Sequence, residues 1–395
     1  MATGSQTAGS VRPVSPEKVV SLLVDSALVA KLMADYPDAE KRLDRAIGLS
    51  LAWGHDFHRA LSEKAALYYL WGKFDRGLQI AHEVIEAGGG KNSESLASAH
   101  NTSGNIHLRL CEFDLAEDHF KQALEHYRQM GMEISIGTVI NNLANIYNIR
   151  GDYGRARDLY LNALEKFEAQ NDIFRTSHVL HSLGQITLAI KDNILARQYL
   201  ERSLALRSKI QDYRGIVNNL LIQIGILTDE KDFEGARDRL FQADQIIKDH
   251  GLTDPHIKVY RDGEAGIFHF TVAEYDQAER CFLGLIGLAE KMGLATFTAG
   301  GYSWLGKTKV FRDGRGEGIS DILKGAELAE SGKLPYELKN AKLYLAECYS
   351  RLGQPAQAED AARSYVEEAV RQGTGQEQAQ KEVRTAMAGA LSTKT

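Results

Sequence analysis

The chain has 395 residues, of which 44% are hydrophobic and 25% are charged, and its formal net charge is −6. A weakly acidic chain has no general attraction to phosphate backbones or anionic lipid, which argues against nucleic acid or a membrane as the partner. The three cysteines lie far apart without a CxxC pair, and no apolar stretch approaches the ~20 residues that span a bilayer. We therefore expect a cytoplasmic protein with reduced thiols.

The opening segment, 1–15, is rich in Gly, Ser and Thr and is expected to be disordered, whereas Ser15 before Pro16 is placed to begin a helix. From residue 16 to residue 371, apolar residues recur at helical spacing and predict nine helix pairs. These pairs are expected at 16–34 and 38–53, 56–71 and 75–88, 94–110 and 114–129, 133–149 and 154–169, 173–190 and 194–209, 213–229 and 234–249, 254–271 and 276–291, 295–312 and 316–330, and 335–351 and 356–371. In the last segment, 372–395, a single helix over Gln376–Leu391 is expected to cap the array before a flexible tail.

Small residues mark the same point near the start of every second helix. They are Ala39, Gly77, Ala116, Ala156, Ala196, Ala236, Ala278, Gly318 and Ala358, at intervals of 38 to 42. A second series lies twelve residues upstream and is small at eight of nine positions, with Ile224 as the exception. A fixed period of this length is the signature of a solenoid, in which one helix pair is repeated. We expect a local packing shift at Ile224 and bending between there and the 42-residue step before Ala278.

The best unit combines Leu143, Ala144, Tyr147, Ala156, Tyr160 and Ala163. This pattern resembles the tetratricopeptide repeat, and the resemblance covers about residues 16–371. The units differ in their period, which is about 40 residues instead of about 34, and in lacking the Pro that usually closes the second helix. They resemble the longer units of cell-polarity and spindle adaptors, MalT-type activators and peptide-receptor phosphatases. The resemblance implies an all-α, right-handed α-solenoid of about nine helix pairs with a C-terminal capping helix.

The resemblance also implies that the first helix of each pair lines a concave groove for a peptide or a partner helix. Eleven residues before the small residue, three successive pairs carry an amide, at Asn105, Asn145 and Gln185. The other candidate residues on this part of the groove are Asn101, Arg109, Asn141, Asn142, Asn148, His178 and His181. An amide both donates and accepts hydrogen bonds, which matches a peptide bond.

A second interpretation of these amides is that they cap or bridge neighbouring helices, and the two roles are compatible. On the binding hypothesis, Asn145→Ala weakens a ligand strongly and leaves the melting temperature almost unchanged. In the later pairs, Tyr260, Trp304 and Lys307 give the groove a more aromatic character. These residues are candidate anchors for the apolar end of a ligand. Trp304 and, in the next pair, Tyr344 are equally well explained as ordinary core residues.

Catalytic and cofactor motifs are missing from the sequence. His178 and His181 have a permissible metal spacing but no Cys or carboxylate nearby to complete a site. The run Gly88–Ser93 lacks the leading Gly of a phosphate loop and the Ser or Thr that directly follows its Lys. We expect no cofactor and a non-catalytic scaffold that binds a peptide or helical segment of a partner protein. The alternative is a regulator whose shape changes when a peptide binds, and self-association stays open.

Overall fold

The computed structural model describes residues 14–88, 93–190 and 192–392, and within these ranges it contains α-helices and one short 3₁₀ helix but no strand. The predicted all-α fold of repeated helix pairs is confirmed. Two predictions, disorder over residues 1–15 and the connection at Gly88–Ser93, fall largely outside the described residues. None of the helices in the described ranges has the length and apolar composition that a membrane span requires.

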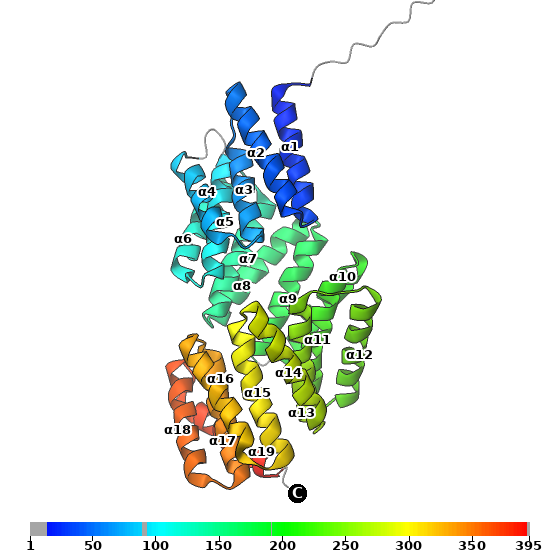
Figure 1. Cartoon of the computed structure of the whole chain (residues 1–395), viewed down its shortest axis with the longest axis vertical. Coiled ribbons are helices and arrows are strands. Elements are labelled where there is room, and N and C mark those ends of the chain that lie inside the picture. The colour runs from blue at the N-terminus through cyan, green and yellow to red at the C-terminus, as the bar shows by residue number, and fades with distance from the viewer. Residues whose placement is uncertain (1–13, 89–92, 191, 393–395) are drawn as a thin grey trace, which may run out of the picture. The chain divides into compact units, whose positions relative to one another are not determined.

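The chain divides into two compact units, Met1–Asp192 and Asn193–Thr395. The first unit contains α1 (Pro16–Leu32), α2 (Tyr36–Trp53), α3 (His58–Leu70), α4 (Phe74–Glu86), α5 (Ser93–Arg109), α6 (Phe113–Gln129), α7 (Glu133–Ile149), α8 (Tyr153–Ala169) and α9 (Ile173–Ala189). The second contains α10 (Asn193–Lys209), α11 (Tyr213–Asp229), α12 (Phe233–Asp249), α13 (Pro255–Thr271), α14 (Tyr275–Met292), α15 (Ala295–Asp313), η1 (Gly316–Gly318), α16 (Ile319–Ser331), α17 (Pro335–Leu352), α18 (Pro355–Arg371) and α19 (Gln376–Ser392). Consecutive helices run antiparallel within each unit, as Figure 1 shows.

The 40-residue period follows from the lengths of the helices and of their connections. From α5 to α12 every helix has 17 residues, and successive helices are separated by three positions. The middle residue of a connection takes a left-handed conformation, as at Gly151 with φ 77°. The next N–H, that of Asp152, then donates to the carbonyl of Tyr147 at 2.9 Å and ends the helix in a Schellman motif. The 42-residue step has a simple cause, because the connection between α12 and α13 is two residues longer.

The repeated small residues lie where two helices touch. A Cβ added to Gly104 would come within 2.6 Å of the Phe120 ring, and one added to Gly306 within 2.3 Å of the carbonyl oxygen of Gly318. The exception, Ile224, is 1% exposed and lies in an apolar cluster with Ala236. Because α11 and α12 keep the common helix length, the larger side chain leaves the repeat in phase.

The last helix, α19, packs against α17 and α18, as the first helix of a further pair would do. Arg351 on α17 donates to the carbonyl oxygens of Phe311 at 3.0 Å and Ala390 at 3.3 Å. The Tyr365 hydroxyl donates to Glu382 at 2.7 Å. Held by these contacts, α19 covers the side of the ninth pair that a further pair would cover. This is the capping role predicted for the segment.

Candidate functional site

Nine of the predicted site residues lie on the first helices of three successive pairs in the first unit. We call them the amide surface: Asn101 and Asn105 on α5, Asn141, Asn142, Asn145 and Asn148 on α7, and His178, His181 and Gln185 on α9. Gln185 and His178 are exposed, and the other seven are half-buried. The helical period places these side chains on one stripe of each helix, since positions three or four residues apart share a face.

Two amides of this surface form hydrogen bonds between helices. The Asn142 Nδ2 atom on α7 donates to the Oδ1 atoms of Asn101 at 3.3 Å and Asn105 at 3.1 Å on α5. The Tyr160 hydroxyl on α8 donates to Asn145 Oδ1. Bridging, the second of the two interpretations drawn from the sequence, thus describes Asn142 and Asn145.

Other amide groups of the surface keep unused hydrogen-bonding capacity. The Nδ2 groups of Asn101 and Asn105 donate to no other residue in the described part of the chain. The side-chain amides of Asn141, Asn148 and Gln185 likewise have no partner among the described residues. A half-exposed amide without a protein partner can exchange its water for a peptide group at little cost. The surface therefore offers donors and acceptors at intervals of one repeat.

The two histidines of this surface lie apart from any cluster of metal-ligating side chains in the described part of the chain. The ring of His178 packs against Phe174 one turn earlier, with centroids 4.6 Å apart. In the described ranges, no group of three or more His, Cys, Asp or Glu side chains is placed to hold a metal ion. Arg109 is exposed in the last turn of α5, where it provides a positive charge at the end of the surface.

An ion-pair network fixes α7 against α6 and thereby positions the amide surface. Arg150, just after α7, contacts Asp114 at 2.5 Å and Glu117 at 2.7 Å, and the Tyr147 hydroxyl donates to Glu117 at 2.8 Å. Burial alone would raise the pKa of Glu117, but hydrogen bonds from Lys121, Tyr147 and Arg150 outweigh it and lower this pKa to about 2. The carboxylate is therefore ionised over the whole physiological range.

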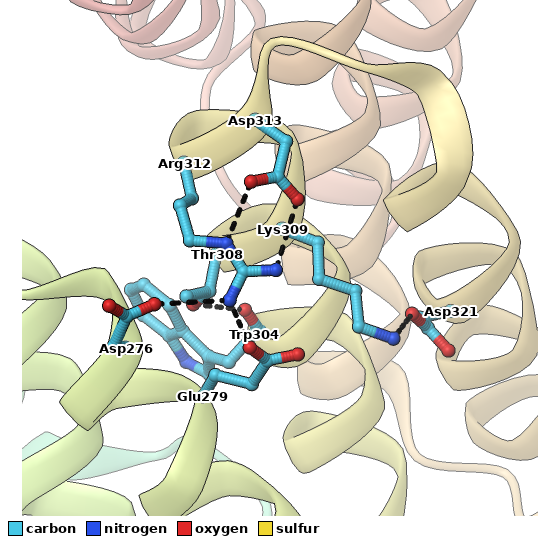
Figure 2. Close-up of polar contacts among 8 residues, drawn as sticks. All are labelled: Asp276, Glu279, Trp304, Thr308, Lys309, Arg312, Asp313 and Asp321. Atoms are coloured by element: carbon cyan, nitrogen blue, oxygen red, sulfur yellow. Dashed lines mark hydrogen bonds and ion pairs between the residues drawn. The ribbon is translucent and has the colours of Figure 1, made fainter.

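The second unit contains a network of the same form. Figure 2 shows Arg312 of α15 between Asp276 and Glu279 of α14, with Asp313 holding the guanidinium from its other side. Asp276 and Glu279 stand two residues before and one residue after Ala278, as Asp114 and Glu117 do around Ala116. The basic partner follows the small residue at the same interval in both units, Arg150 after Ala116 and Arg312 after Ala278. This regular spacing is a signal in the sequence that could have revealed the network.

The predicted site residues of the second unit lie in a closed environment. Lys307 is 7% exposed and forms an ion pair with Glu347 on α17. Its Nζ atom lies 4.4 to 5.7 Å from the ring centroids of four aromatic residues, Phe270, Trp304, Phe311 and Tyr344. We call Lys307, Glu347 and these rings the aromatic cluster. Tyr260 is half-buried and packs beside the neighbouring apolar cluster of α11 to α13. Phe270 and Phe311 were absent from the predicted site.

The comparisons with known proteins show what these helix pairs are similar to. Residues 135–209 match the tetratricopeptide repeat model. Among solved structures, a Rap protein complexed with competence and sporulation factor is similar with a TM-score of 0.68 and 13% identity, covering 91% of this chain and 99% of that one. The apo quorum sensor NprR from B. thuringiensis is similar with a TM-score of 0.62 and 14% identity over 90% and 99% of the two chains. Aspartyl phosphate phosphatase F from Bacillus subtilis gives 0.59 and 12% over 95% and 97%.

A search of curated proteins gives no match. At these identities, the likeness to the three solved structures concerns the fold alone. The repeat model, the 40-residue period and the buried small residues agree with one another over α7 to α10. The described helix pairs therefore have the fold of tetratricopeptide repeats, with a long period of about 40 residues.

Proposed function

We propose that the chain is a non-catalytic binding protein that holds an extended peptide segment of a partner on the amide surface. The observation that carries this proposal is the set of unpaired amide groups on α5, α7 and α9, which recur with the repeat. An extended peptide presents N–H and C=O groups in alternation, and each side-chain amide matches both. The asparagines and the glutamine are uncharged, so such a surface recognises backbone more than charged side chains.

The similar structures support this class of function. One is a Rap protein in complex with competence and sporulation factor, and another is the quorum sensor NprR. A sensor must respond to what it binds, and this favours the second candidate function, a ligand-responsive regulator. A further similar structure is named an aspartyl phosphate phosphatase, so absence of catalysis is part of the proposal and needs its own assay.

Selection from a displayed library of short random peptides tests the binding proposal. The wild-type chain should enrich peptides that the double variant Asn105→Ala/Gln185→Ala does not retain. Asn340→Ala is the matched control, because Asn340 is a half-buried asparagine on α17, in the second unit. Equal retention of the enriched peptides by the wild type and the double variant would remove the amide surface from the proposal.

Two further measurements separate the candidate functions. Small-angle scattering of the chain with and without an enriched peptide should show a change of shape for a regulator and none for a static scaffold. Incubation with an acyl phosphate, such as acetyl phosphate, should give hydrolysis no faster than in buffer. Faster hydrolysis than in buffer that the double variant Asn105→Ala/Gln185→Ala reduces would make the chain an enzyme.

A further inference from the structure

Four histidines alternate along the seam between α5 and α6. His100 and His107 come from α5, and His119 and His126 come from α6. Seven residues, or two helical turns, separate the members of each couple, so both point from the same face of their helix. Because the two helices are antiparallel, the four rings meet in the order His107, His119, His100, His126. We call them the histidine row.

The contacts in the histidine row are close and involve ring nitrogens. The rings of His107 and His119 stack with centroids 5.3 Å apart, and those of His100 and His126 with centroids 6.1 Å apart. Between His100 and His119 the centroids are also 5.3 Å apart, and the two Nδ1 atoms are separated by 3.1 Å. His107 is held at its other end by Glu112, whose Oε2 atom lies 2.6 Å from Nδ1.

The contact between His100 and His119 is a hydrogen bond only when one of the two facing Nδ1 atoms carries a proton and the other does not. A neutral imidazole has one donor and one acceptor nitrogen, whereas a protonated one has two donors. With one Nδ1 protonated, the pair forms a hydrogen bond between α5 and α6. When both rings carry a charge, two N–H groups face each other and the bond becomes a repulsion.

The surroundings of His100 and His119 oppose the protonation of these two rings. Burial, then the charges that His119, His126 and His82 of α4 would carry, lower the pKa of His100 to about 4. Burial, then His107 and His82, also lowers the pKa of His119, against a smaller opposite effect of Asp118. Asp118 therefore acts on His119 and Glu112 contacts His107, whereas the other groups that act on His100 and His119 are imidazoles.

We propose that the histidine row is a proton-sensing element that loosens α5 from α6 on acidification. Its link to ligand binding rests on the proposed function, since α5 also carries Asn101 next to His100 and Asn105 two residues before His107. A shift of α5 would move these amides relative to α7, where Asn142 now bridges both. The proton would then weaken peptide binding without entering the amide surface.

The direction of the pH dependence follows from the lowered pKa of His100. The unfolded chain takes up this proton near pH 6.5, whereas the folded chain resists it until about pH 4. The unfolded state therefore binds more protons in this window, and the row's stabilising contribution is complete above pH 6.5 and is lost as the pH falls toward 4.

Nuclear magnetic resonance of the full chain with ¹⁵N-labelled histidine tests the proposal. His100 should titrate at least one pH unit, or about tenfold in proton affinity, below the ordinary histidine value of 6.5. In His119→Gln, the midpoint of His100 should move up, because the facing ring and its charge are removed. Titration of His100 at its ordinary value, or an unchanged midpoint in His119→Gln, would overturn the proposal.

Hydrogen exchange supplies the structural readout. After correction for the intrinsic effect of pH, exchange in residues 93–129 should rise between pH 6.5 and 4.5 more than in the neighbouring pair, 133–169. His119→Gln should reduce this difference, and His256→Gln should leave it intact; equal responses of the two pairs in the wild type would refute the proposal. Neither measurement uses a ligand, so failure here leaves the binding proposal standing, and failure of peptide selection leaves the proton-sensing proposal standing.

Discussion

The amide surface and the aromatic cluster occupy the same position of the repeat but have opposite environments. Asn105, Asn145 and Gln185 lie eleven residues before their small residues, and so do Lys307 and Glu347. In the first unit this position is half-buried or exposed and keeps unused amide groups. In the second, the lysine and the glutamate neutralise each other beneath four aromatic rings. One repeat position therefore keeps unused amide groups in one unit and forms a buried ion pair in the other.

The largest expected effect is at the aromatic cluster. Lys307→Met leaves the carboxylate of Glu347 buried without its partner, and we expect a loss of about 3–5 kcal/mol of unfolding free energy. Lys309→Met is the matched control, because the pair of Lys309 and Asp321, drawn in Figure 2, is more exposed. That variant should lose less than about 1 kcal/mol in denaturant unfolding. Similar losses in both variants would mean that burial gives the pair of Lys307 and Glu347 no special contribution to stability.

A smaller effect is expected at Asn145. The sequence predicts little loss of stability in Asn145→Ala, but the structure changes this expectation because the Tyr160 hydroxyl, in a residue 1% exposed, donates to Asn145. Loss of the acceptor of a buried hydroxyl costs about 1–3 kcal/mol, and less where a second side chain, here Ser182, is within hydrogen-bonding reach. Adding Tyr160→Phe removes both partners and should recover most of the loss in thermal unfolding. A double variant no more stable than Asn145→Ala would show that the pair contributes through packing.

The Glu117 network should give an acid-dependent effect of about 1 kcal/mol or less at neutral pH. Because the pKa of Glu117 is lowered to about 2, its contribution is complete above pH 4.5 and is lost as the pH falls toward 2. Glu117→Gln should therefore flatten the fall of the unfolding midpoint between pH 5 and pH 3. The exposed Glu165→Gln is the control and should follow the wild-type curve. If both variants follow it, Arg150 does not hold α7 through this carboxylate.

The smallest effect on stability is expected where the effect on binding is largest. Asn105→Ala and Gln185→Ala remove groups on which no described buried donor depends, so each should change the unfolding free energy by no more than about 0.5 kcal/mol. Measured beside Lys307→Met, these variants sharpen the contrast between the two units. If Asn105→Ala lost several kcal/mol of unfolding free energy, the amide surface would be a structural element, like the aromatic cluster.

Much of the architecture could be predicted because the rules that produce it are local. Small residues such as Ala116 and Ala156 lie where two helices touch and a larger side chain would not fit, and they recur once in each repeat. A left-handed residue such as Gly151 ends one helix, and the next begins two residues later. Helix ends predicted in this way agree with the structure to within a few residues.

The candidate site was harder to predict because its residues act through partners on other helices. The stripe of Asn105, Asn145 and Gln185 follows from helical spacing, but the donation from Tyr160 to Asn145 depends on how α8 lies against α7. The histidine row had a sequence signal, two couples of histidines seven residues apart, that points to one face of each helix. Their interleaving required the antiparallel contact of α5 with α6.

The sequence by itself determined the repeat, the helices and the residue types available at each position, since these follow from period, size and local backbone preference. Only the tertiary structure decided which polar groups are satisfied within the protein and which keep unused hydrogen-bonding capacity. Hydrogen bonds and ion pairs have short range, so a shift of one helix by a few ångströms decides whether an amide or an ammonium group meets a partner. Asn105 and Lys307 stand at the same point of the repeat, and their neighbours on other helices give them different roles.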